Sequence, residues 1–384
     1  MAVLRPVDMK IQPAPYEGRI RVINKILEQL QKYRPLKADV ESTAVHWEYE
    51  VAKRSTSKQS YKFNANVLLR DITKHKGNLN KRGRYEAPKQ QMSKDTVMEK
   101  LRALILDIET LKESGYITIK EVTAERQLEE PENKRRACAR CLTKFSEDDI
   151  MVPTRCQYHS SKPQYNRYTK SSQYMCCGET GNSVTPFSLG CTTLEHHVYR
   201  QETYEDMSKT IKFKTTTGIP GSSNVLALDC EMAYTSLGYE LIRLTIVDFW
   251  TNEVCFDEIV QPIGEIIDLN SQFSGVHQID RAVSLTFHEA RDIFLSPKMI
   301  NENSILIGHG LENDLNVLRI IHDKIIDTAI LYPSGKFKSS LKNLAFQELS
   351  RRIQDGEHDS SEDAIATMDV VKHKLGIPLD RKTW

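Results

Sequence analysis

The chain has 384 residues, and because domains usually hold about 150 residues each, this length predicts two or three domains. Hydrophobic residues make up 39% of the sequence and charged residues 27%, an ordinary balance for globular proteins that argues against disorder and membrane insertion. The net charge of only +1 gives the whole chain little attraction for nucleic acid, so local basic patches would have to supply it.

Two sequence features bear on where the protein works. No apolar run approaches the roughly 18 residues that a membrane-spanning helix needs. The first residues, MAVLRPVD, lack the long apolar stretch and small-residue cleavage site of a secretory signal. We therefore expect an intracellular protein whose cysteines remain thiols or bind metal.

The first 130 residues are predicted to form a small helical domain with a long basic loop. Apolar residues recur at helical spacing in residues 17–33, and further helices are expected at about 38–52 and 95–114. Residues 70–100 carry nine Lys or Arg against four Asp or Glu, among them Lys81, Arg82 and Arg84. This segment is either a solvated surface loop or a patch that contacts phosphate groups, since charge runs occur in both.

Residues 137–200 hold six of the eight cysteines, at spacings typical of metal sites. Thiolate and imidazole are the preferred ligands of Zn²⁺, and two ligands separated by two residues can wrap one ion in a tight turn. Eight ligands predict two structural, four-coordinate zinc sites, and interleaved sites are as compatible with the spacing as sequential ones. The predicted ligands are Cys138, Cys141, Cys156, His159, Cys176, Cys177, Cys191 and His196, with His197 adjacent to the last.

The remainder of the chain is predicted to be a linker followed by an α/β domain. Residues 201–223 are polar and rich in Lys, Thr, Gly and Ser, which is typical of linkers. In residues 224–384, short apolar runs alternate with helical periods. Strands are expected at 225–230, 240–248, 253–260, 304–307 and 325–327, and helices near 288–300, 311–320, 339–352 and 361–375.

Two acids follow an apolar run in the segment LALDCEM. Asp229 and Glu231 are two residues apart, so a strand would carry both carboxylates on one face. Two such charges repel each other unless cations lie between them, and hard oxygen ligands favour Mg²⁺ or Mn²⁺. The pair alone is weak evidence, because a solvated strand end can carry the same pattern.

Two later segments carry further candidates for the same site. In GHGLENDL, Asp314 lies in the first turn of an expected helix, with Glu312 as a competing acid; helix starts favour acids for electrostatic reasons as well. In HDSSEDA, His358 precedes an expected helix that carries Asp363 in its first turns. Histidine takes up a proton near neutrality, so His358 suits a general base.

The order and spacing of these residues resemble the three motifs of the DEDDh exonucleases, and LALDCEM, GHGLENDL and HDSSEDA resemble those of Rex-type RNA exonucleases. The Cys/His segment and helical N-terminal region extend the likeness to the fungal RNA exonuclease 3 subgroup. This resemblance implies a ribonuclease H-like domain, a mixed sheet flanked by helices, after the zinc module. It implies hydrolysis of RNA from the 3′ end to 5′-mononucleotides with two Mg²⁺ or Mn²⁺ ions.

The resemblance also assigns roles to the candidate residues. It makes Asp229, Glu231, Asp314 and Asp363 the metal ligands and His358 the base, and it suggests that Phe273 contacts RNA. It further implies trimming of structured non-coding RNAs, as in ribosomal RNA processing, in the nucleus or cytoplasm. Two alternatives stay open: a catalytically silent RNA-binding or scaffolding protein, and a DNA exonuclease, since the five residues act on the phosphodiester and do not read the 2′-OH.

Overall fold

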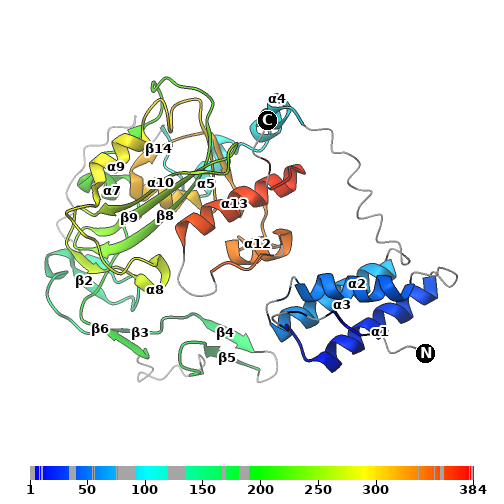
Figure 1. Cartoon of the computed structure of the whole chain (residues 1–384). Helices are drawn as coiled ribbons and strands as arrows, with labels where there is room; N and C mark the ends of the chain where they lie inside the picture. The colour runs from blue at the N-terminus through cyan, green and yellow to red at the C-terminus, as the bar shows by residue number, and fades with distance from the viewer. Residues whose placement is uncertain are drawn as a thin grey trace. The chain divides into compact units, whose positions relative to one another are not determined.

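The structure, a computed structural model, describes residues 5–7, 9, 12–33, 40–53, 55, 57–74, 76, 92–119, 135–166, 170–180, 190–335, 337–349, 351–354, 359–379, 381 and 384. The chain divides into two units, Met1–Met92 and Ser93–Trp384 (Figure 1). Within these described ranges, no helix has both the length and the apolar character needed to cross a membrane. Lys81, Arg82, Arg84 and His358 lie outside the described residues.

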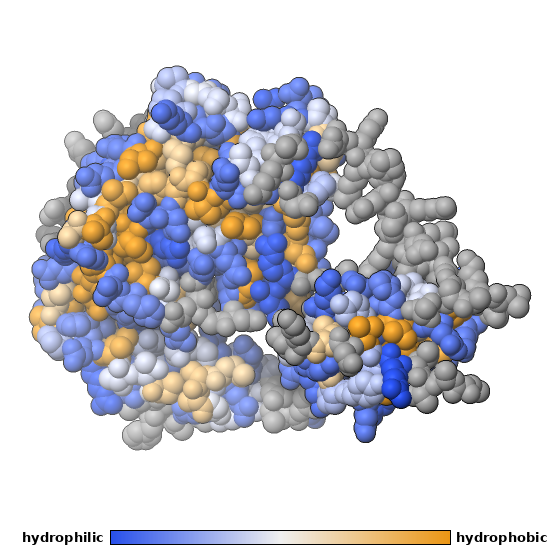
Figure 2. Space-filling model, viewed as in Figure 1, coloured by the Kyte–Doolittle hydropathy of each residue, from blue (hydrophilic) through white to orange (hydrophobic). Residues whose placement is uncertain are grey.

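The smaller unit is built on three helices, α1 (Tyr16–Tyr33), α2 (Val40–Lys53) and α3 (Lys58–Lys74). The first two confirm the predicted helices to within about two residues. The third was missed because its sequence is mostly polar, although its buried residues Tyr61, Ala65 and Ile72 do recur at helical spacing. On the face drawn in Figure 2, apolar residues of this unit form one group surrounded by hydrophilic ones.

A buried ion pair joins the three helices of this unit. The Arg19 guanidinium donates to both carboxylate oxygens of Glu48 at 2.7 and 2.8 Å, and both residues are fully buried. Its third nitrogen donates to the carbonyl of Val7 and to Gln12, while the Tyr61 hydroxyl donates to Glu48 at 2.7 Å. Because each charge has hydrogen-bonding partners, the pair is tolerated inside the unit, and it fixes how α1, α2 and α3 meet.

Replacing Glu48 with Ala is expected to destabilise the smaller unit by about 3–5 kcal/mol, because Arg19 would keep a buried charge without its partner. Hydrogen exchange of peptides from α1, α2 and α3, measured in the full chain, would report the loss of protection. The exposed Glu41 of α2 offers the control, since Glu41→Ala removes a solvated carboxylate. Equal protection in the two variants would contradict a structural role for the ion pair.

The larger unit contains a mixed sheet, and this confirms the predicted α/β class. Its strand order is β12-β10-β9-β8-β13-β15, and β11 pairs with one end of β8. Neighbours β8, β9 and β10 are antiparallel, whereas β13 and β15 run parallel to β8. The strands are β8 (Val225–Thr235), β9 (Gly238–Asp248), β10 (Val254–Gln261), β11 (Ile266–Asp268), β12 (Leu285–Thr286), β13 (Ile305–Gly308) and β15 (Ile325–Asp327).

Helices cover both faces of this sheet. The main core includes Leu226, Leu228 and Cys230 of β8 together with residues of α9 (Phe287–Phe294) and α10 (Leu311–Leu318). The other face carries α13 (Ser360–Leu375), which packs on β8 and β9 and contacts α12 (Leu341–Leu349) (Figure 1). Alternation along β8 therefore turns Asp229 and Glu231 away from the main core and toward the α13 face.

Residues 93–119 belong to the larger unit, which differs from the predicted boundary near residue 130. The expected helix at 95–114 is two short helices, α4 (Lys94–Arg102) and α5 (Ile108–Glu113), because Asp107 accepts the Thr110 amide and starts a new helix. Leu106, Leu111 and Tyr116 are buried in the main core, and the Leu106 amide donates to the Ile325 carbonyl of β15 at 2.9 Å.

The predicted linker at 201–223 also differs from the structure. It contains α7 (Tyr204–Thr210) and β7 (Lys214–Thr215), and β7 pairs in parallel with β14 (Ile320–Ile321). Two apolar side chains of this polar stretch, Met207 and Ile211, are buried. Burial of these residues, which composition alone did not reveal, fixes the segment on the larger unit.

Candidate functional site

Asp229 and Glu231 lie on β8 at the centre of the sheet. Their ladder partners on β9 are Thr245 and Arg243, and the β-bulge of this ladder begins only after Glu231. Both carboxylates therefore share one strand face, as the spacing predicts. Glu231 is buried and Asp229 is half-buried, so water solvates both carboxylates poorly.

Asp314 reaches this position from the first turn of α10. Parallel pairing of β13 with β8 ends at Ala227, so the Cys230 amide lies beyond the ladder and donates instead to the Asp314 carboxylate at 2.9 Å. Asp314 is thereby attached to the backbone between Asp229 and Glu231. The competing acid, Glu312, accepts from Lys338 at 2.6 Å, which favours Asp314 over Glu312 as the third acid.

Asp363 lies in the first turn of α13, opposite the acids of β8. The Ser360 hydroxyl donates to Thr245 of β9 at 2.7 Å and approaches the Asp229 carbonyl at 3.3 Å, so the start of the helix is fastened to both strands. Asp363 is 3% exposed and accepts from Gln354 at 2.7 Å. The predicted base, His358, immediately precedes the α13 cap Asp359 in the sequence.

Burial and mutual repulsion raise the pKa values of three of these acids. Burial, together with the charges of Asp314, Glu231 and Asp363, raises the pKa of Asp229 well above its ordinary value. Burial and the Asp363 charge raise the pKa of Glu231 to about 8 even though Arg243 opposes the shift, and burial raises the pKa of Asp314 to about 7. Buried, mutually repelling carboxylates are the donor set that a divalent cation would stabilise, so the residues present fit Mg²⁺ or Mn²⁺.

These shifts predict that the protein without magnesium loses stability as the pH rises. The folded pKa values of Glu231 and Asp314 exceed their ordinary values of 4.5 and 3.8, so the folded state binds more protons than the unfolded state. Their stabilising contribution is present below about pH 4 and is lost as the pH rises through about 7 to 8. We expect a lower Tm at about pH 8.5 than at about pH 6, and a larger rise in Tm on adding Mg²⁺ at the higher pH.

Thermal unfolding of protein dialysed free of magnesium would test this pH dependence. The double variant Glu231→Gln with Asp314→Asn is the control, because it removes two of the titrating groups. A difference in Tm between the two pH values that is equal in the double variant and the wild type would contradict the assignment to these acids.

Asp327, at the end of β15, holds the segment that carries Asp314. It is fully buried, and its carboxylate accepts from the amides of Gly310 and Leu311 at 2.9 and 3.2 Å. The Tyr116 hydroxyl, from the segment after α5, donates to the same carboxylate at 2.5 Å. The sequence placed Asp327 only at a strand end, because the contacts that give it this role join residues far apart in the chain.

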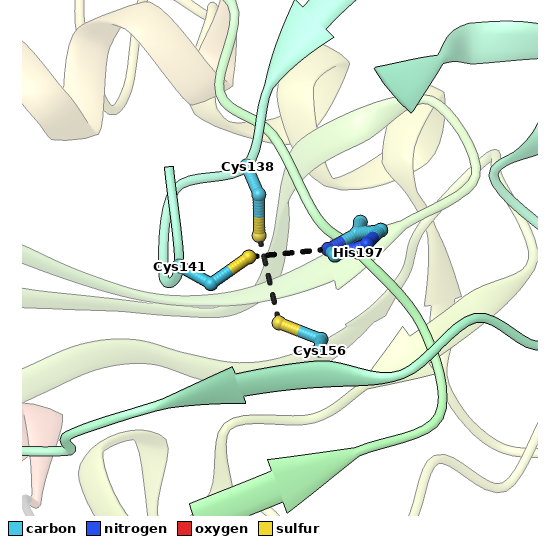
Figure 3. Close-up of side chains that lie close together, drawn as sticks. All are labelled: Cys138, Cys141, Cys156 and His197. Atoms are coloured by element: carbon cyan, nitrogen blue, oxygen red, sulfur yellow. Dashed lines mark hydrogen bonds between the residues drawn. The ribbon is translucent and has the colours of Figure 1, made fainter. Parts of the chain in front are cut away.

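Two groups of Cys and His side chains gather in residues 135–200. The first comprises Cys138, Cys141, Cys156 and His197, whose ligand atoms converge on one point (Figure 3). The second comprises His159, Cys176, Cys177 and Cys191. Within each group, the ligand atoms all lie within 4.8 Å of one another, and among the described residues no three of the acids near Asp229 form so tight a group.

The spacing within each group fits a four-coordinate zinc ion. Two sulfur ligands at about 2.3 Å from zinc with a tetrahedral angle between them are about 3.8 Å apart. The Cys138 and Cys156 sulfurs are separated by 3.7 Å, and the Cys191 and Cys176 sulfurs by 3.5 Å. Three thiols and one imidazole in each group are a typical structural zinc set, so both groups could hold this metal.

The two groups interleave along the chain. Cys156 and His159 lie at opposite ends of β3 (Cys156–Tyr158), and Cys191 and His197 lie on either side of β6 (Thr192–Leu194). Because β3 and β6 are paired antiparallel, this ladder connects the two groups. Interleaving was one of the arrangements left open by the ligand spacing.

His197, and not the predicted His196, completes the first group. Neighbouring side chains of an extended chain point to opposite sides, so only one of two adjacent histidines can reach the sulfurs. His197 is 7% exposed, its Nδ1 lies 3.3 Å from the Cys141 sulfur, and its ring stacks on Phe145. The ring of His196 belongs to neither group.

The first group packs against the mixed sheet of the larger unit. Cys138 and Cys156 are fully buried in a cluster that includes Tyr234 of β8. Arg140, between two of the cysteines, lies over the Tyr234 ring and forms an ion pair with Asp268 of β11.

Phe273, the predicted RNA contact, lies in the short helix α8 (Ser271–Ser274) that follows β11, and its side chain is 47% exposed.

Comparisons with known proteins add family evidence to this geometry. Residues 4–108 match the model of the REX3 N-terminal domain, and residues 136–191 match that of the RNA exonuclease 3 middle domain. The chain is 72% identical over 384 residues to "RNA exonuclease 3" of Eremothecium gossypii, covering 100% of both chains. It is 53% identical to "RNA exonuclease 3" of Saccharomyces cerevisiae, covering 100% of this chain and 99% of the relative.

Two more distant likenesses complete the comparison. "Putative exonuclease GOR" of Homo sapiens is 33% identical over 369 residues, which cover 91% of this chain and 52% of the human one. Among solved structures, the Saccharomyces cerevisiae Pan2 pseudoubiquitin hydrolase-RNA exonuclease module in complex with A7 RNA is 27% identical. That match has a TM-score of 0.37 and covers 43% of this chain and 30% of the Pan2 chain.

Proposed function

The chain belongs to the RNA exonuclease 3 family, and we propose that it is an exoribonuclease that removes 5′-mononucleotides from the 3′ end of RNA. The proposed catalytic domain is ribonuclease H-like and spans residues 224–384 together with the packed segment 93–119. A mixed sheet with helices on both faces supports this assignment.

The observation that carries the proposal is the meeting of acids from three separate elements. Asp229 and Glu231 come from β8, Asp314 from α10 and Asp363 from α13. Burial, together with the charges of the other three acids, raises the pKa of Asp229. Repulsion between buried carboxylates destabilises the folded protein, and a bound cation removes this repulsion. A cluster of this kind is therefore typical of a metal-binding functional site. We assign these four residues as ligands of two Mg²⁺ or Mn²⁺ ions.

Each part of the proposed site has a defined chemical task. Bound metal ions would supply the positive charge that stabilises the attacking and leaving oxygens of the scissile phosphate. His358 would accept a proton from the attacking water, since an imidazole is largely neutral and basic near pH 7. Ser360 holds the start of α13 on β8 and β9, and Asp327 holds the start of α10, so both helices present their acids at fixed positions.

The two Cys/His groups are proposed to hold structural Zn²⁺ ions. Each offers four ligands, which leaves no open position for a substrate or water. We further propose structured non-coding RNAs as substrates and the nucleus or cytoplasm as the site of action. Phe273 is retained as a proposed RNA contact because its ring is exposed on α8, a helix that contacts β8 of the acidic site.

An assay on 5′-labelled RNA and DNA of the same sequence, with and without Mg²⁺, would test the proposed function. We expect a ladder of RNA products that shorten from the 3′ end only when Mg²⁺ is present. RNA binding without any nucleotide release would indicate a silent binding protein. Faster trimming of DNA than of RNA would overturn the proposed substrate class.

A further inference from the structure

Phe337 is a large apolar side chain that the fold leaves outside every core cluster. Its side chain is 78% exposed, compared with 47% for Phe273. A phenylalanine ring is more stable when it is removed from water, so the exposed ring of Phe337 would gain from contact with the apolar face of a partner. Single exposed apolar residues are common, so it is the position of Phe337 near the acidic site that distinguishes it.

Phe337 lies in a turn between α11 (Thr328–Leu331) and α12 that is closed by hydrogen bonds to Ser334. The Ser334 amide donates to the Phe337 carbonyl at 2.9 Å, and the Phe337 amide donates to the Ser334 carbonyl at 3.3 Å. Gly335 supplies the positive φ of 65° that this tight turn requires. These two backbone hydrogen bonds hold Phe337 to Ser334 in the free chain.

The turn is anchored to the helix that carries Asp314. Lys338, directly after Phe337, donates to the Glu312 carboxylate at 2.6 Å, and Glu312 lies in the first turn of α10. Ser339 is 6% exposed, and its backbone forms a hydrogen bond with His309 of the segment GHGLENDL. Phe337 is therefore held next to the loop and helix start that position one of the four acids.

We propose that Phe337 stacks on a nucleobase of the RNA strand whose 3′ end occupies the acidic site. This inference rests on the proposed function. An exposed aromatic face beside a phosphodiester-cleaving site matches how proteins hold single strands, because every base has a face that can stack irrespective of sequence. Lys338 is paired with Glu312, so among the described residues 334, 335, 337 and 338 the Phe337 ring is the group that offers RNA a contact.

Kinetics on a purified full-length protein test the proposal. Phe337→Ala is expected to lower kcat/KM on single-stranded RNA by about 5- to 150-fold, the range that removal of one base–aromatic stack produces. The loss should lie in KM, with kcat changed less than about two-fold, because the ring touches no reacting atom. Phe337→Trp should retain wild-type kcat/KM. Ile293→Ala, an exposed apolar residue on α9, a helix that packs on the main core and not on the face that carries the acids, is the matched control and should change nothing.

RNAs with one abasic nucleotide near the 3′ end distinguish base stacking from other roles. At one position, the missing base should cost the wild type as much as Phe337→Ala does, and the mutation should then add less than about a two-fold loss, as expected when both changes remove one interaction. Equal kcat/KM for Phe337→Ala and Ile293→Ala, or equal losses at every abasic position, would overturn the inference. A wild type that releases no nucleotide at all would overturn the proposed function first.

Discussion

Asp314→Asn is expected to lower nucleotide release by about 100- to 1,000-fold or more at saturating Mg²⁺. The amide keeps the oxygen that accepts from the Cys230 amide, so the position of α10 should be preserved, while the charge that would bind metal is lost. The Tm of magnesium-free protein at about pH 8 is expected to stay equal or rise, because one of the repelling carboxylates disappears. Single-turnover rates and thermal unfolding measured on the same preparation would show both effects.

Two further variants test whether the loss of activity in Asp314→Asn is specific to that carboxylate or follows from removing any nearby acid. Asp292→Asn removes an exposed carboxylate of α9 that pairs only with Lys214, and it should leave activity unchanged. Glu312→Gln removes the competing acid of the same turn and is expected to cost less than about ten-fold, through a looser Lys338 contact. A larger loss for Glu312→Gln than for Asp314→Asn would reverse the assignment of the third acid.

Cys138→Ser is expected to remove the ion of the first Cys/His group and unfold the segment around it. Structural zinc contributes about 10–16 kcal/mol to the folding of small metal modules, and the described strands of residues 135–200 have only three or four residues each. Because Cys138 and Cys156 pack with Tyr234 of β8, we also expect weaker RNA binding, with less effect on the chemical step. Metal analysis and the split of the loss between KM and kcat would measure these outcomes.

The second group offers a comparison, because its cysteines are exposed. Cys191→Ser should also lower the zinc content by one ion per chain, yet disturb the sheet less, since Cys176, Cys177 and Cys191 all lie at the surface. A zinc content of two ions per chain in Cys138→Ser would refute the ligand assignment. Identical losses of RNA affinity in both variants would argue that the contact with Tyr234 has no special importance.

Local patterns were sufficient for the parts of the molecule whose structure depends on neighbouring residues. The strand of LALDCEM, the turn and helix of GHGLENDL and the helix that begins within HDSSEDA follow from apolar periodicity, glycine and capping residues. Taken singly, Asp229, Glu231, Asp314 and Asp363 could each be an ordinary surface or helix-start acid, and their order and spacing named them as one site only together with the resemblance to the DEDDh exonucleases. Ligand types and spacing likewise predicted two metal groups. These features are encoded within a few residues and do not require knowledge of the fold.

Only the tertiary structure decided which distant residues act together. It selected His197 over His196, divided eight ligands into two interleaved groups, and brought Tyr116 to the Asp327 carboxylate that holds α10. It also joined residues 93–119 and 201–223 to the larger unit, because a few apolar side chains there are buried in its core. Sequence spacing reports which face of an element is apolar, whereas these choices depend on packing between elements that are up to 211 residues apart.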